Sequence, residues 1–85
     1  MKTLAKALIQ SAAFFELSGE DIISLDDSVQ ALEDIAHTLQ SASPEELAAV
    51  RDALQELAAE ERAGFARADV LRFYEQFLEN IGVTL

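Results

Sequence analysis

The side chains of this sequence that could do chemistry are mostly carboxylates. The 85 residues include sixteen Asp and Glu, one His and no Cys. Glu33 and Asp34 precede His37 by four and three residues, which is one helical turn, so a carboxylate–imidazole pair is one candidate site. A zinc site takes three or four protein ligands, and a di-iron bundle needs two Glu-x-x-His motifs. We therefore expect no metal at His37 and no cofactor.

Motifs of the common enzyme classes are missing from the chain. There is no Gly-x-Ser-x-Gly sequence around a nucleophile, and no glycine-rich loop that would hold phosphate. The acidic stretch 20–27 lacks the alternating ligands, central Gly and final Glu of a calcium loop. Nothing in the sequence selects two carboxylates as an acid and a base. We predict that the protein is not an enzyme and has no catalytic residue.

The charge balance favours a protein as the partner. Six Lys and Arg against sixteen acids give a net charge of −10. This charge opposes binding to nucleic acid or to an anionic membrane, where cations must neutralise phosphates. It favours fast association with a protein that has a basic surface.

The first residues briefly look like a signal peptide, with Lys2 and Lys6 before an apolar run. Gln10 interrupts that run and Glu16 follows it closely, so we expect a helix of the mature protein. No apolar stretch is long enough for a transmembrane helix. Because the chain also lacks Cys, the expected location is cytoplasmic.

The clearest helix signal begins at Ser43. A Ser followed three residues later by Glu46 is a capping box, and Pro44 suits the first helical position. The helix should cover 44–63 and end at Gly64 in the left-handed conformation. Its apolar stripe combines four large side chains with two alanines: Leu47, Val50, Ala53, Leu54, Leu57 and Ala58.

Acidic residues on the opposite face of this helix are the candidate partner-binding surface. At about 100° per residue they form a band about 80° wide, and the band contains Glu45, Asp52, Glu56 and Glu60. Glu56 and Glu60 are like charges one turn apart, which we interpret as unpaired acids. Glu33 and Asp34, on the polar face of the preceding helix, complete the predicted surface. The alternative is a solvated face that serves only solubility.

Three other segments show helical periodicity, over about 3–17, 27–40 and 69–81. Ser18-Gly19 should end the first with a left-handed Gly19, Asp69 should cap the last, and Gly82 should end it. The expected apolar positions are Leu4, Leu8, Ala12 and Phe15 in the first helix, Val29, Leu32, Ala36 and Leu39 in the second, and Val70, Phe73, Tyr74, Phe77, Leu78 and Ile81 in the last.

The connections should be short and packed. We expect Ile22 and Ile23 to lie against the core, and Phe65 to fold back onto it after Gly64. The link 40–43 is so short that it should make the second and third helices antiparallel neighbours.

These patterns predict an all-α fold, a compact four-helix bundle-like single domain over 1–85 with short loops. The predicted function is a non-catalytic, strongly acidic protein-binding module, and an inhibitor or immunity protein for a basic partner is one concrete form of it. The alternative is a structural or self-associating subunit that forms homo-oligomers through an apolar surface. Leu17, Leu71 and Leu85 are candidates for such a patch.

Overall fold

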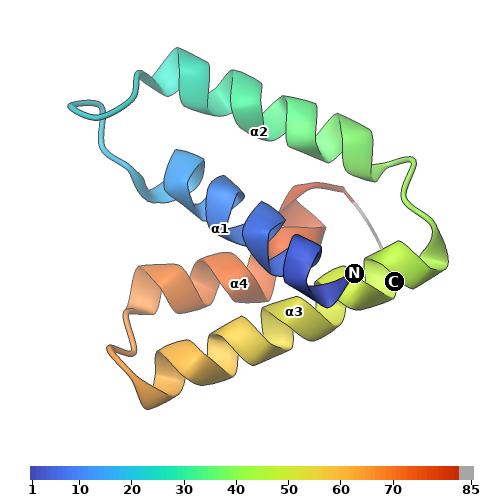
Figure 1. Cartoon of the computed structure of the whole chain (residues 1–85). Coiled ribbons are helices and arrows are strands. Elements are labelled where there is room, and N and C mark those ends of the chain that lie inside the picture. Colours follow the sequence, from blue (N-terminus) through green and yellow to red (C-terminus); the bar gives the residue numbers. More distant parts are fainter. Residues whose placement is uncertain (83–85) are drawn as a thin grey trace.

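The computed structural model describes residues 1–82, which fold into helices without any strand. The helices are α1 (Lys2–Leu17), α2 (Leu25–Leu39), α3 (Pro44–Ala63) and α4 (Ala68–Asn80), and Figure 1 shows their arrangement. The all-α, four-helix bundle-like fold is therefore confirmed, and each helix begins within two residues of its predicted start.

Helix α1 occupies the centre of the molecule. It packs against each of the other three helices, and α3 packs against α4 as a helical hairpin. Within the described residues, α2 approaches the backbone of α1 alone, on the side away from α3 and α4 (Figure 1). The prediction that α2 and α3 are antiparallel neighbours is therefore wrong. A short link keeps the end of α2 close to the start of α3, but it does not fix the angle between the two helices. The apolar side chains of α2 pack against α1 instead.

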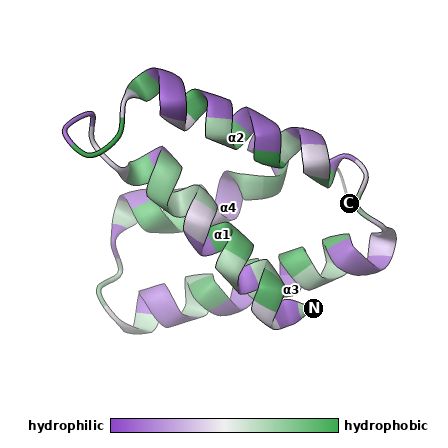
Figure 2. Cartoon of the chain, turned by 45° about the horizontal axis from the view of Figure 1, so that its top comes forward, coloured by the Kyte–Doolittle hydropathy of each residue, from purple (hydrophilic) through white to green (hydrophobic). Residues whose placement is uncertain are grey.

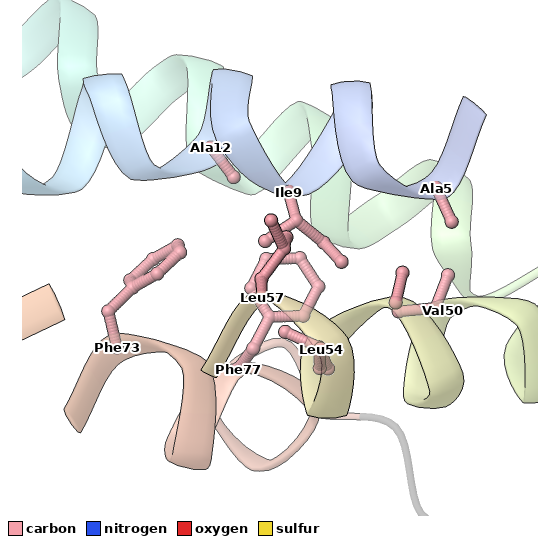
Figure 3. Close-up of a cluster of buried hydrophobic side chains, with 9 residues drawn as sticks. Ala5, Ile9, Ala12, Val50, Leu54, Leu57, Phe73 and Phe77 are labelled. Carbon is pink, nitrogen blue, oxygen red and sulfur yellow. The ribbon is translucent and has the colours of Figure 1, made fainter. Parts of the chain in front are cut away.

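The core lies between α1 and the α3–α4 hairpin (Figure 3). Ile9 and Phe77 are its largest fully buried side chains, and Phe73 meets Phe77 edge to face with ring centroids 5.5 Å apart. The buried members of this cluster are Ala5, Ile9, Ala12, Val50, Ala53, Leu54, Leu57, Phe73 and Phe77.

The buried stripe of α1 contains Ala12, as predicted, but not the two predicted leucines. Ala5, Ile9 and Ala12 are buried, whereas Leu4 is 75% exposed and Leu8 only half-buried. At about 100° per residue, the centre of the buried face lies about 70° around the helix from the predicted centre. The small side chains of Ala5 and Ala12 allow α1 to approach the hairpin closely, and the larger leucines face away from it.

Side-chain caps mark the starts of α2 and α3. The capping box of α3 is confirmed, because the Glu46 N–H donates to Ser43 Oγ at 3.1 Å and the Ser43 N–H donates to Glu46 Oε1 at 2.9 Å. Helix α2 begins earlier than predicted because Ser24 Oγ accepts from the Asp27 N–H at 3.2 Å. Asp69 is not the cap of α4, which begins after Arg67.

The turn residues behave differently from the glycine-based predictions. Gly19 and Gly64 are not left-handed, whereas Ala66 is, with φ of 52°. Gly82 does end α4 with φ of 78°. Phe65 is 86% exposed instead of packing on the core, and the Arg67 guanidinium lies 5.5 Å from its ring centroid.

The connection between α1 and α2 also packs less than expected. Ile22 is 64% exposed, and Ile23 is only half-buried. Leu25, at the start of α2, is exposed as well. The packed loop was therefore a wrong prediction: backbone hydrogen bonds from the N–H groups of Ile22 and Ile23 to Gly19 hold it as a local turn.

Candidate functional site

The predicted acidic band on α3 is divided by ion pairs with α1. Glu56 accepts from Lys2 at 2.9 Å and from Lys6, and Lys6 also lies 3.6 Å from Glu60. Hydrogen bonds from the two lysines lower the pKa of Glu56 to about 2, and the Glu56 hydrogen bond in turn raises the pKa of Lys6. The interpretation of Glu56 and Glu60 as unpaired acids is therefore wrong. Lys2 and Lys6 are one turn apart and so lie on the same face of α1, which was the sequence signal that both could reach one acid.

The remaining predicted acids lie in separate places. Glu45 and Asp52 are exposed on α3, and Asp52 Oδ1 accepts from its neighbour Arg51 at 3.3 Å. On α2, Asp34 accepts from Gln30 Nε2 at 2.9 Å. Glu33 is exposed and lines a groove that faces α4. Of the six predicted residues, Glu33 alone lines this groove.

Sequence reasoning missed a buried acid, Glu61, whose side chain is 8% exposed. Its carboxylate accepts from Arg67 three times, from the backbone N–H at 2.9 Å, from Nε at 3.0 Å and from Nη2 at 2.8 Å. The Arg67 side chain, followed by its backbone N–H, lowers the pKa of Glu61 to about 2. Glu61 follows Leu57 and Ala58 at helical spacing, which was the signal that it points inward. This pair holds the α3–α4 turn.

The groove lies between α2 and α4, at the C-terminal end of α1. Apolar side chains from both helices form its surface, and its volume is about 470 Å³. The α2 side contributes Val29, Leu32 and Ala36, and the α4 side contributes Phe73, Phe77 and Ile81. The polar lining residues are Glu16, Glu33 and Asn80.

The groove exists because the backbone of α2 packs on α1, while its link to α4 lies at the C-terminal caps of the two helices, where Gln40 Nε2 donates to the Ile81 carbonyl oxygen at 2.9 Å. Ser28 is the one residue of α2 that is buried, and Val29 is 45% exposed. Leu32 and Ala36 are half-buried. Figure 2 shows apolar and polar residues alternating along the visible surface of α2. The predicted apolar ladder of α2 is thus present, but part of it faces the groove rather than a neighbouring helix.

The charged residues that line the groove are acidic, and Arg72 lies in an adjoining hollow that shares Glu16 with it. Glu16 and Glu33 are the groove's charged lining residues, and no Lys or Arg is among them. Both acids are exposed, so water solvates their carboxylates in the free protein. A bound cation would then pair with them, and neither carboxylate would be buried without a partner. An apolar surface with carboxylates at its edge suits a ligand that carries apolar side chains flanked by positive charge.

No protein family model matches the chain, and neither do the curated proteins or the solved structures. Within residues 1–82 there is no cluster of three or more His, Cys, Asp or Glu side chains that could hold a metal ion. Over the same range, no helix is both long and apolar enough to cross a bilayer.

Proposed function

We propose that the protein is a non-catalytic binding module whose α2–α4 groove accepts a basic amphipathic helix of another protein. The observation that carries this proposal is a groove with an apolar surface and only acidic charges, Glu16 and Glu33, among its lining residues. Grooves of this type take a helix whose apolar residues recur at i, i+3, i+4 and i+7. Lys or Arg beside those anchors would meet the two carboxylates.

The charge of the whole molecule supports the same partner. A net charge of −10 attracts a cationic helix from a distance and raises the rate of encounter at low salt. An inhibitor or immunity protein for a basic target is one form that this activity can take. The cytoplasm remains the proposed compartment, because the chain has no Cys.

A model peptide tests the proposal. The probe is a fluorescein-labelled amphipathic helix of Leu and Lys, with Leu at i, i+3, i+4 and i+7, titrated with the protein while anisotropy is recorded. The variant Glu16→Lys/Glu33→Lys should bind at least about tenfold more weakly than the wild type. The matched control Glu45→Lys/Asp52→Lys makes the same change in net charge outside the groove and should lose no more than about twofold. Equal losses in the two variants, or no binding by the wild type, would reject the groove.

A self-associating subunit is the second candidate, and one apolar surface favours it. Leu4 is 75% exposed and Met1 is 63% exposed. They border a groove of about 160 Å³ that Leu8, Leu39 and Ala42 also line. Leu17 is partly exposed and Leu71 half-buried, while Leu85 lies outside the described residues. If the chain self-associates through the surface of Met1 and Leu4, its mass in sedimentation equilibrium should rise with concentration at high salt. The variant Leu4→Glu should then have the mass of the monomer.

A further inference from the structure

A second groove, between α3 and α4, carries the opposite charge. Its volume is about 290 Å³. Leu54 and Ala58 from α3, both buried, and Leu78 from α4, half-buried, provide its apolar part. Arg51 and Arg62 also line it, together with Gln55, Tyr74 and Glu75. It therefore contains two guanidinium groups and one carboxylate, so an acidic ligand would be held by local charge, against the long-range repulsion of a chain whose net charge is −10.

The two arginines are available for a ligand. Arg62 forms no ion pair within residues 1–82. Over the same residues, the ion pair of Arg51 is with the adjacent Asp52, at 3.3 Å, and both side chains are half exposed. Such an exposed pair is weak and easily exchanged. By contrast, Lys6 and Arg67 are held by carboxylates of α3.

The helix places the arginines at the two ends of one face. Arg51 and Arg62 are eleven residues apart, which corresponds to about 16 Å along α3 and about 20° around it. Leu54 and Ala58 lie between them at helical spacing. Tyr74, on the facing helix, is half-buried, and this burial raises the pKa of its hydroxyl. The neutral phenol therefore adds apolar surface and a hydrogen-bonding group without adding charge.

We infer that the α3–α4 groove is a second docking surface, and that its occupant is an acidic amphipathic helix of a partner protein. Arginine binds carboxylates in a planar, two-point geometry, so a partner with acids about three turns apart could meet both guanidinium groups. Apolar residues between those acids would contact Leu54, Ala58 and Leu78. This surface shares α4 with the acid-lined groove but none of its lining residues.

Selection from a phage-displayed library of helical peptides tests this inference. Peptides are enriched on the immobilised wild-type protein, and the affinities of the enriched sequences are then measured by anisotropy. Basic helices for the α2–α4 groove should be enriched as well, but the peptides that test this inference have Asp or Glu on both sides of apolar residues. Arg62→Glu should weaken them by about tenfold and Arg51→Glu/Arg62→Glu by more, whereas Arg62→Lys should keep part of the affinity.

Matched controls separate this surface from general electrostatics and from the first groove. Arg72→Glu makes the same charge change as Arg62→Glu but lies outside the groove, so it should cost less than about twofold. Glu16→Lys/Glu33→Lys should leave the acidic peptides bound. Circular dichroism confirms that each variant is folded. The inference would be overturned if no acidic peptide were enriched, or if Arg62→Glu and Arg72→Glu weakened binding equally. It would also be overturned if the enriched peptides matched only acidic segments of this chain and the protein self-associated through them.

Discussion

At the scale of single residues, Glu61 is an acid that the α3–α4 turn buries against Arg67. Its pKa is about 2 in the folded chain against an ordinary 4.5. A lowered folded-state pKa contributes stability above the ordinary value, and this contribution is lost as the pH falls towards the folded value. Glu61→Gln should therefore lower the urea midpoint most above pH 4.5, and the difference from the wild type should shrink as the pH falls from 4.5 through about 2. Urea unfolding across that range measures it, with exposed Glu45→Gln as the control. A difference independent of pH would contradict the role of the Arg67 contact.

Ala66 provides a test of backbone strain at the same turn. A non-glycine residue in the left-handed region is strained, and φ at Ala66 is 52°. Ala66→Gly should raise the free energy of unfolding by about 0.5 to 1 kcal/mol, because relief of strain exceeds the added chain entropy. The matched variant Ala59→Gly, at an exposed position inside α3, should lose about 1 kcal/mol. A loss at both positions would show that Ala66 is unstrained.

At the scale of elements, the sequence predicts each helix better than its neighbours. Ser43 and Glu46 form a local motif, so the start of α3 could be read directly. The buried face of α1 could not, because Leu4 and Leu8 make as good a stripe as Ala5 and Ile9 until close packing against the hairpin decides between them. The same limit applies to the site. Glu33 was selected for its charge, but its groove depends on which helix α2 contacts.

Core and groove positions should respond differently to truncation. Phe77 is 2% exposed and Val29 is 45% exposed, although both line the α2–α4 groove. Phe77→Ala should cost about 3 to 5 kcal/mol because it leaves a cavity in the core. Val29→Ala should cost less than about 1 kcal/mol, because its side chain is already partly in water. Urea unfolding compares the two, and equally large losses would show that α2 is closed onto α4 in solution.

At the scale of the whole molecule, the net charge of −10 sets the response to salt. Repulsion among sixteen acids destabilises the compact state, and few ion pairs offset this repulsion. Added salt shortens the screening length from about 10 Å at 0.1 M to about 3 Å at 1 M. The free energy of unfolding should therefore rise over this range when measured with urea, which is itself uncharged. A decrease would mean that the pairs of Lys2 and Lys6 with Glu56 outweigh the repulsion.

The central claim is that the acid-lined groove between α2 and α4 binds a cationic helix. Site-specific photo-crosslinking tests it most directly, with benzoylphenylalanine placed at Val29 in the groove, or at Asp52 and Leu4 outside it, in the native host's lysate. The account predicts a crosslink from Val29 to a basic segment of another protein, and its loss in the Glu16→Lys/Glu33→Lys background. Crosslinks from Asp52 or Leu4 alone, or from Val29 only to another copy of this chain, would contradict it.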